Sequence, residues 1–182
     1  EPKVNFMHLI YIRLRVQSYL AREKLIVNKD KFIEEIKLTK NQMYIVALSI
    51  LKNNEDAEDI VQEALLVAYE KLYTLKDDNK FKSWMMRIVV NQAKMYIRKN
   101  RNIVYMDHVE DLVEKNAEEE GGNQNIWELV LSLKSELSTV VILYYEQNYS
   151  ICEISKIMHV PSGTVKSRLS RARALLKRKL EE

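Results

Sequence analysis

The sequence predicts an all-α protein with two small helical domains joined by an acidic flexible linker. Only three glycines and two prolines occur in 182 residues, too few for the many turns of a β-sandwich. Apolar residues recur at the spacing of amphipathic helices, most clearly between Ile60 and Leu72. Charge is also segregated. Residues 80–101 carry seven basic and no acidic side chains, whereas residues 102–125 carry seven acidic and one basic. Such blocks indicate a modular chain whose surfaces meet different partners.

Composition excludes several classes of protein and of site. A single cysteine cannot form an internal disulfide, which excludes a disulfide-stapled secreted scaffold. Three well-separated histidines and one cysteine do not form a zinc site, so we expect no metal and no cofactor. No stretch approaches the roughly 18 uncharged apolar residues of a membrane span, so we expect a cytoplasmic protein without membrane insertion. Residues 1–31 form a basic extension, with a helix around 9–27, to which no function is assigned.

The first domain is expected over residues 32–101. Its apolar periodicity predicts one or two helices over residues 32–52, an amphipathic helix over about 56–72 and, after a polar break at 76–80, a helix over 81–100. Asp56 lies in the first turn of the amphipathic helix, where a carboxylate complements the helix dipole. In the last helix, basic side chains surround Phe81 and Trp84. Basic groups that follow phosphates and rings that stack on unpaired bases suit single-stranded DNA, although a tryptophan at the position of Trp84 more often belongs to the core than to a stacking surface.

A linker over residues 102–125 precedes a second domain over residues 126–182. Three helices are expected there, over about 126–146, 150–158 and 162–180. Ser150 is placed to cap the short helix, His159 lies at the following turn, and Pro161 with Ser162 begins the last helix. Helix, short turn and helix form the helix-turn-helix pattern.

The last helix of this motif carries side chains that can donate hydrogen bonds to phosphates and to base edges in the major groove. Every residue from Lys156 to Leu180 is basic or uncharged, which favours DNA over a merely solvated basic face. The candidate DNA contacts are Thr164, Lys166, Ser167, Arg168, Ser170, Arg171 and Arg173.

Three stretches in this order resemble the extracytoplasmic-function sigma factors, the compact class of specificity subunits of bacterial RNA polymerase. They are NNEDAEDIVQE at 53–63, FKSWMMRI at 81–88 with Asn91 and Arg98, and GTVKSRLSRAR at 163–173. Each stretch alone is moderately specific for this family. The three stretches in this order, with the acidic linker before the last one, are strongly specific. The resemblance covers about residues 32–180.

The resemblance implies a role for each domain. The first would bind core polymerase through a coiled coil of the β′ subunit, with Asp56, Asp59, Gln62 and Glu63 as candidate contacts. It would also melt and bind the single-stranded −10 promoter element through Trp84, Asn91, Lys94, Arg98 and Lys99. The second domain would bind the double-stranded −35 element through the seven donors of its last helix. The partners implied are core RNA polymerase (β′ and β subunits), promoter DNA and an anti-sigma factor, with no catalysis.

Two positions depart from the family pattern. Met95 stands where the family commonly has Asp, and His159 stands at a turn position where it commonly has Gly. A positive φ at that turn is tolerable for His, though less easily than for Gly.

Three other interpretations remain for the residues alone. A helix-turn-helix transcriptional activator would bind DNA without programming core polymerase, but residues 32–101 show no strand-like alternation of an upstream receiver domain. A small nucleic-acid enzyme could hold Mg²⁺ with paired carboxylates such as Asp56 and Asp59, whose simpler roles are capping and docking. An anti-sigma or adaptor protein would lack the terminal DNA-binding motif.

Overall fold

A computed structural model describes residues 29–100 and 124–181. Within these two ranges the chain is made of helices and helical turns and contains no strand, which confirms the all-α prediction. All but the last three residues of the basic extension, and nearly all of the predicted linker, lie outside the described residues.

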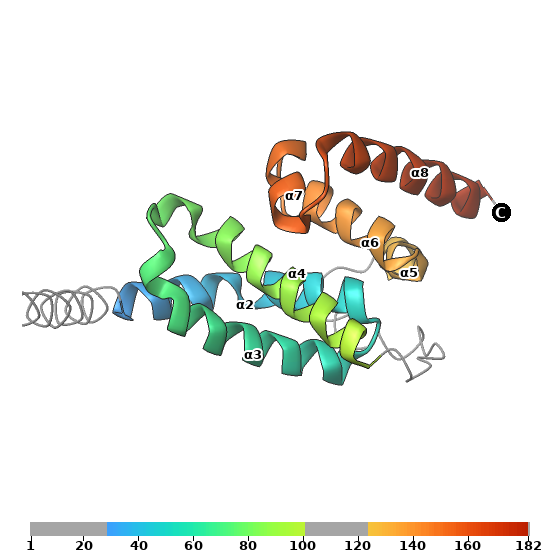
Figure 1. The fold of residues 1–182 in the computed structure, drawn as a ribbon. Helices are drawn as coiled ribbons and strands as arrows, with labels where there is room; N and C mark the ends of the chain where they lie inside the picture. Colours follow the sequence, from blue (N-terminus) through green and yellow to red (C-terminus); the bar gives the residue numbers. More distant parts are fainter. Residues whose placement is uncertain (1–28, 101–123, 182) are drawn as a thin grey trace, which may run out of the picture.

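The first helical unit is a bundle of three long helices. They are α2 (Lys29–Leu51), α3 (Asn54–Lys71) and α4 (Phe81–Lys99), with the 3₁₀ turns η1 (Leu72–Thr74) and η2 (Asp78–Lys80) between the last two. The Asn53 side chain caps α3 by accepting a hydrogen bond from the Asp56 backbone N–H at 3.0 Å. Met43, Ile60 and Met85, one from each helix, are fully buried. Figure 1 shows α4 lying across α2, with α3 on the outer side.

The second unit contains four α-helices and a π-helical turn. They are α5 (Gln124–Ser132), α6 (Ser135–Val141), the π turn η5 (Ile142–Glu146), α7 (Ile151–Met158) and α8 (Ser162–Glu181).

The single helix expected over 126–146 is wrong, because the chain breaks between α5 and α6. Leu131 and Leu133 are both buried, although residues two apart point to nearly opposite sides of an α-helix. The break allows both side chains to enter the core. It also directs the Ser135 hydroxyl to α2, where it donates to the Ile50 carbonyl at 2.8 Å.

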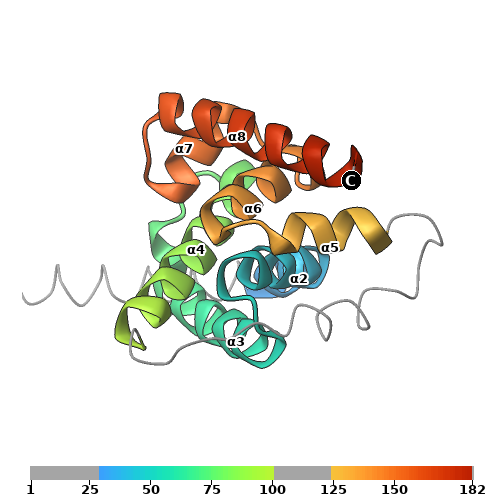
Figure 2. The same ribbon diagram turned by 90° about the vertical axis from the view of Figure 1, so that its right-hand side faces the viewer.

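The two units are packed against each other. Figure 2 shows α6 between the three-helix bundle and the α7–α8 pair. α6 packs on α2 and α7 packs on α4, so the buried apolar side chains of both units form one continuous core. The sequence predicted two domains but not this contact, which determines how accessible the candidate DNA-binding residues are.

Ser150 caps α7, as its position predicted, and with Glu153 it forms a complete capping box that was not predicted from the sequence. The Ser150 hydroxyl accepts from the Glu153 N–H at 3.3 Å, and the Glu153 carboxylate accepts from the Ser150 N–H at 2.9 Å and from its hydroxyl at 2.7 Å. Hydrogen bonds from Ser150 hold the pKa of Glu153 below its ordinary value. The box therefore contributes fully above that ordinary value and is lost as the pH falls through the lowered pKa.

We expect Ser150→Ala to lower the free energy of unfolding by about 1 kcal/mol, because the first turn of α7 loses its side-chain acceptor. Urea denaturation at neutral pH followed by circular dichroism measures the change. Ser150→Thr, which keeps the hydroxyl, is the matched control and should lose much less. Equal stability of the alanine variant and the wild type would contradict a stabilising role for this box.

Candidate nucleic-acid interface

The turn between α7 and α8 is held by three hydrogen bonds around Ser155. Its carbonyl accepts from the backbone N–H groups of His159 and Val160, and its hydroxyl donates to the Val160 carbonyl at 2.7 Å. His159 has φ 54° and ψ 50°, the left-handed conformation expected from the family pattern. The turn therefore fixes the angle at which α8 leaves α7 and gives the helix-turn-helix motif its shape.

One face of α8 is buried and the opposite face points to solvent. Val165, Leu169 and Ala172 pack into the core. At 100° per residue, four of the predicted DNA contacts form one contiguous surface on the opposite face. We name this surface the outer face of α8, and its members, all exposed, are Lys166, Ser167, Ser170 and Arg171.

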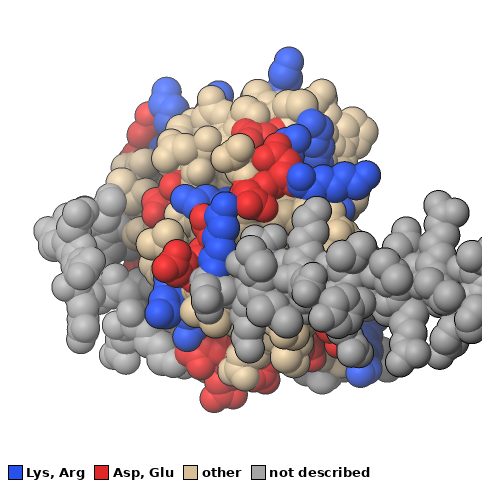
Figure 3. Space-filling model, turned by 90° about the vertical axis from the view of Figure 1, so that its left-hand side faces the viewer, with Lys and Arg blue, Asp and Glu red and all other residues tan. Residues whose placement is uncertain are grey.

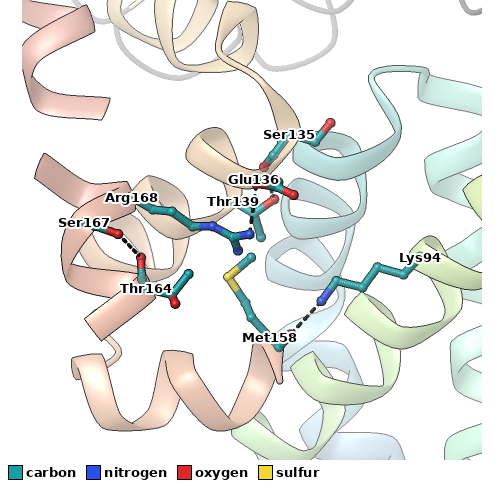
Figure 4. Close-up of polar contacts among 8 residues, drawn as sticks. All are labelled: Lys94, Ser135, Glu136, Thr139, Met158, Thr164, Ser167 and Arg168. Atoms are coloured by element: carbon teal, nitrogen blue, oxygen red, sulfur yellow. Dashed lines mark hydrogen bonds and ion pairs between the residues drawn. The ribbon is translucent and has the colours of Figure 1, made fainter. Parts of the chain in front are cut away.

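Of the other three predicted contacts of α8, Arg168 and Arg173 bind side chains within the protein, and Thr164 lies half-buried beside this face. The half-buried Thr164 accepts a hydrogen bond through its carbonyl from the Ser167 hydroxyl at 3.0 Å. Arg168 is only 17% exposed in its side chain, and its Nη2 atom lies 2.9 Å from the Glu136 carboxylate on α6. Figure 4 shows this guanidinium reaching inward to α6, away from the outer face.

Arg173 is held by two tyrosines of η5. Its Nε–H donates to the Tyr145 hydroxyl at 2.8 Å. Its guanidinium carbon lies 5.9 Å and 5.7 Å from the ring centroids of Tyr144 and Tyr145, a cation–π geometry. Arg173 nevertheless remains exposed at the edge of the outer face, whereas Arg168 is turned inward.

The predicted −10 contacts of α4 also differ in exposure. Trp84 is half-buried and its ring packs against Phe81 at 6.0 Å, so it contributes to the core as the sequence allowed. Asn91 is half-buried, whereas Arg98 and Lys99 are exposed in the last turn.

Lys94 points to the second unit. Its Nζ donates to the Met158 carbonyl at the end of α7, at 2.6 Å (Figure 4). Burial, and to a smaller degree the positive charge of Arg168, lowers the pKa of Lys94. One predicted −10 contact and one predicted −35 contact thus lie close enough to influence each other.

On α3, the predicted polymerase contacts Asp59, Gln62 and Glu63 are exposed. Asp56 is not fully available, because its Oδ1 accepts a hydrogen bond from the Tyr96 hydroxyl of α4 at 2.6 Å. Its Oδ2 is buried and has no partner among the described residues. Figure 3 shows acidic side chains along the lower edge, the level of α3, and basic ones projecting at the top, the level of α8.

A groove of about 710 Å³ lies at the surface between α2 and α3. Lys37, Lys40 and Tyr44 line it from α2, and Glu58 and Gln62 line it from α3. Of the predicted polymerase contacts, Gln62 is therefore at the edge of a depression that a protruding partner could enter.

Within residues 29–100 and 124–181, no three His, Cys, Asp or Glu side chains lie close enough together to hold a metal ion. The helices of these ranges are also too short or too polar to cross a bilayer.

Comparison with known proteins identifies both units. The family model for Sigma-70 region 2 matches residues 36–103, and that for Sigma-70 region 4 matches residues 123–176. The RNA polymerase sigma factor SigV of Bacillus subtilis is 32% identical over 139 residues, which cover 76% of this chain and 84% of SigV. The ECF RNA polymerase sigma-E factor of Escherichia coli K12 is 30% identical over 142 residues, covering 69% of this chain and 74% of that factor.

The chain belongs to the extracytoplasmic-function (ECF) sigma factors. It is therefore a subunit that directs RNA polymerase to promoters, and the activator interpretation is not favoured. ECF RNA polymerase sigma factor SigW of Bacillus subtilis is similar over a longer stretch, with 29% identity over 171 residues that cover 85% of this chain and 91% of SigW. Sigma factors are in general not enzymes.

Two solved structures share the fold of this sigma factor. One is RpoE in a co-crystal structure with the anti-sigma factor NepR from Bartonella quintana, with a TM-score of 0.68, 23% identity and coverage of 83% of this chain and 97% of that chain. The other is CnrH in complex with the cytosolic domain of CnrY, with a TM-score of 0.63, 20% identity and coverage of 90% and 96%.

Sequence reasoning missed the residues that hold the two units of this sigma factor together. The hydroxyls of Ser49 and Thr139 are hydrogen-bonded at 2.9 Å and are buried. It also missed Glu136 and the tyrosines of η5. None of these residues has a local signal, since each acts on a side chain far away in the sequence.

We expect Tyr96→Phe to lower the free energy of unfolding by about 1–3 kcal/mol, because it leaves both Asp56 oxygens without a side-chain partner in a half-buried position. Thermal or urea denaturation measures the loss. Tyr73→Phe is the matched control, since Tyr73 is 71% exposed, and should leave stability unchanged. An unchanged stability of Tyr96→Phe would mean that water replaces the hydroxyl at no cost.

Proposed function

We propose that the two units divide promoter recognition between them. Residues 32–101 would bind core RNA polymerase and the −10 element, residues 126–182 would bind the −35 element, and the acidic linker 102–125 would connect them along the surface of the polymerase. The protein would act in the cytoplasm, without cofactor, metal or catalysis of its own.

The outer face of α8 carries this proposal. Lys166, Ser167, Ser170 and Arg171 lie on one solvent-exposed surface of the second helix of a helix-turn-helix motif, the helix that enters the major groove in proteins of this architecture. Lysine, arginine and serine supply donors to the acceptors of guanine and to phosphates. With no acidic residue between Lys156 and Leu180, this helix can approach DNA without charge repulsion.

For the −10 element, the exposed Arg98 and Lys99 favour contact with the phosphates of a single strand. Their helix has no acidic residue, and single-stranded DNA is commonly bound by basic grooves flanked by aromatic side chains. Lys94 is also exposed, although its ammonium is hydrogen-bonded to Met158, and Trp84 and Asn91 are half-buried. A base captured outside the stack costs a few kcal/mol, which phosphate contacts of this kind help to offset.

For core polymerase, the proposed contacts are Asp59, Gln62 and Glu63 on α3, which suit a β′ coiled coil with basic or mixed charge. Complementary charge increases the association rate more than it increases affinity. Asp56 would contribute chiefly by capping α3 and by its hydrogen bond with Tyr96. The β subunit is the second polymerase contact that we propose.

An anti-sigma factor is a further proposed partner. The two structures of similar fold were determined with the anti-sigma factor NepR and with the cytosolic domain of CnrY. This sigma factor would be held by a protein of the same class until a signal releases it.

We expect Arg171→Ala to weaken binding to the cognate −35 duplex more than binding to a scrambled duplex. Each base contact contributes roughly 1–3 kcal/mol, or about 5-fold to 150-fold in affinity, at a given salt concentration. Fluorescence anisotropy at fixed ionic strength, with the −35 sequence first selected from a promoter library by run-off transcription, measures both affinities. Arg87→Ala, an exposed arginine of α4, is the control. Equal losses on both duplexes would make Arg171 a phosphate contact only.

We expect the double variant Asp59→Ala, Gln62→Ala to reduce the affinity for core RNA polymerase roughly tenfold or more, as removal of central interface residues commonly does. Its circular dichroism spectrum and stability should match those of the wild type, since both side chains are exposed. Lys76→Ala, in the exposed break before η2, is the control. Unchanged affinity in a titration of core enzyme would move the docking surface away from α3.

A further inference from the structure

The guanidinium of Arg173 on α8 lies against an aromatic corner formed by the π turn η5. Its Nε–H donates to the Tyr145 hydroxyl at 2.8 Å, and its carbon atom lies 5.7 Å from the centroid of that ring and 5.9 Å from the centroid of the Tyr144 ring. The two rings meet edge to face, with their centroids 4.9 Å apart and their planes at 79°. Two neighbouring side chains therefore hold one cation of the helix-turn-helix motif.

The π turn allows two adjacent residues to reach the same guanidinium. The Gln147 N–H donates to the Ile142 carbonyl at 3.0 Å, which is the five-residue spacing of a π-helix. Adjacent side chains of an α-helix point about 100° apart, and the wider π turn reduces this angle. Ile142 and Leu143 of the turn are buried and anchor it in the core. Turns of this kind are frequent at functional sites.

This contact holds Arg173 without neutralising its charge. Arg168, by contrast, is paired with the carboxylate of Glu136 at 2.9 Å and is only 17% exposed (Figure 4). No carboxylate of the described residues forms an ion pair with Arg173, and a tyrosine hydroxyl is uncharged at neutral pH. Since Tyr145 binds the Nε–H, the terminal NH₂ groups of Arg173 remain available for a bidentate contact with the oxygens of an anion.

The position of Arg173 on α8 indicates which anion it meets. Lys166, Ser170, Arg173 and Lys177 are exposed and follow one another at steps of four, three and four residues, so they form one row along the helix. In a helix-turn-helix protein the first residues of this helix contact base edges in the major groove. Arg173 lies about 10.5 Å further along the helix than Lys166, and the groove is only about 12 Å wide. Arg173 therefore comes to the sugar-phosphate wall of the groove.

We propose that Tyr145, supported by the ring of Tyr144, is a positioning residue for −35 binding: it holds the guanidinium of Arg173 ready for a backbone phosphate at the edge of the major groove. This inference rests on the proposed function and adds residues of η5 to it. Ordering a long, flexible side chain costs free energy on binding, and a side chain that is ordered beforehand avoids that cost. A phosphate contact fixes the register of the protein on the duplex without reading its sequence.

A double-mutant cycle tests this role. Holoenzyme is assembled from core RNA polymerase and each variant, and its affinity for a promoter fragment with the selected −35 sequence is measured at fixed salt. Tyr145→Phe removes the hydroxyl and keeps the ring. We expect it to reduce affinity about 2-fold to 10-fold, the range for ordering one flexible side chain, when Arg173 is present. We expect no effect in the Arg173→Ala background.

Two controls separate positioning from an effect on the fold. The stability of Tyr145→Phe should match that of the wild type, since Tyr145 is 54% exposed. Tyr73→Phe, a change at a 71% exposed tyrosine of the first unit, should leave promoter affinity unchanged in both backgrounds. A residue that only stabilised the fold would reduce affinity whether or not Arg173 were present.

The salt dependence of binding identifies the ligand of Arg173. We expect Arg173→Ala to weaken binding to cognate and scrambled −35 sequences by the same factor. It should also reduce the slope of log affinity against log salt concentration by about one, as loss of one phosphate contact does. Tyr145→Phe keeps the cation, so its slope should stay closer to that of the wild type.

Three results would overturn the inference. They are an equal loss from Tyr145→Phe in both backgrounds, no loss from it when Arg173 is present, and wild-type affinity and salt slope in Arg173→Ala. Each of them leaves the proposed function in place as long as wild-type holoenzyme initiates at the promoter. Failure of the wild type to direct transcription would instead overturn the proposed function.

Discussion

The contact between α6 and α2 is the constraint on which the rest of the structure depends. It joins the apolar interiors of the two units into one core, and at its centre the hydroxyls of Ser49 and Thr139 bind each other out of contact with water. α6 in turn carries Glu136, which holds Arg168 of α8. Together with the packing of α7 on α4, this helix pair determines the position of the helix-turn-helix motif relative to the three-helix bundle.

Local chemistry explains why so much of the fold could be predicted from the sequence. Ser150, His159 and Pro161 each constrain the backbone within a few residues of themselves, and the helices that they delimit were found nearly where they were expected. The apolar repeats of α3, α4 and α8 likewise depend only on neighbouring residues. The break between α5 and α6 was missed because its cause, burial of both Leu131 and Leu133, depends on packing against other helices.

The sequence predicted which residues belong to the candidate site better than it predicted how their side chains are arranged. Helical spacing alone places Lys166, Ser167, Ser170 and Arg171 on one side, but it does not reveal that Arg168 would meet Glu136 or that Arg173 would lie on two tyrosine rings. Asp56 shows the same limit, since its partner Tyr96 lies 40 residues away. For a charged side chain at the flank of a helix, contacts with residues far away in the sequence decide whether it binds within the protein or points to solvent.

The left-handed backbone at His159 has a consequence for how this gene can vary. Branched side chains such as Val, Ile and Thr are strained at φ 54°, whereas Asn and Asp are tolerated and Gly is not strained at all. In the genetic code a single base change converts a histidine codon to one for asparagine or aspartate, but none converts it to one for glycine. A single mutation can therefore replace this histidine with asparagine or aspartate, which the turn tolerates. Glycine requires two mutations, and the intermediate residue must itself be functional.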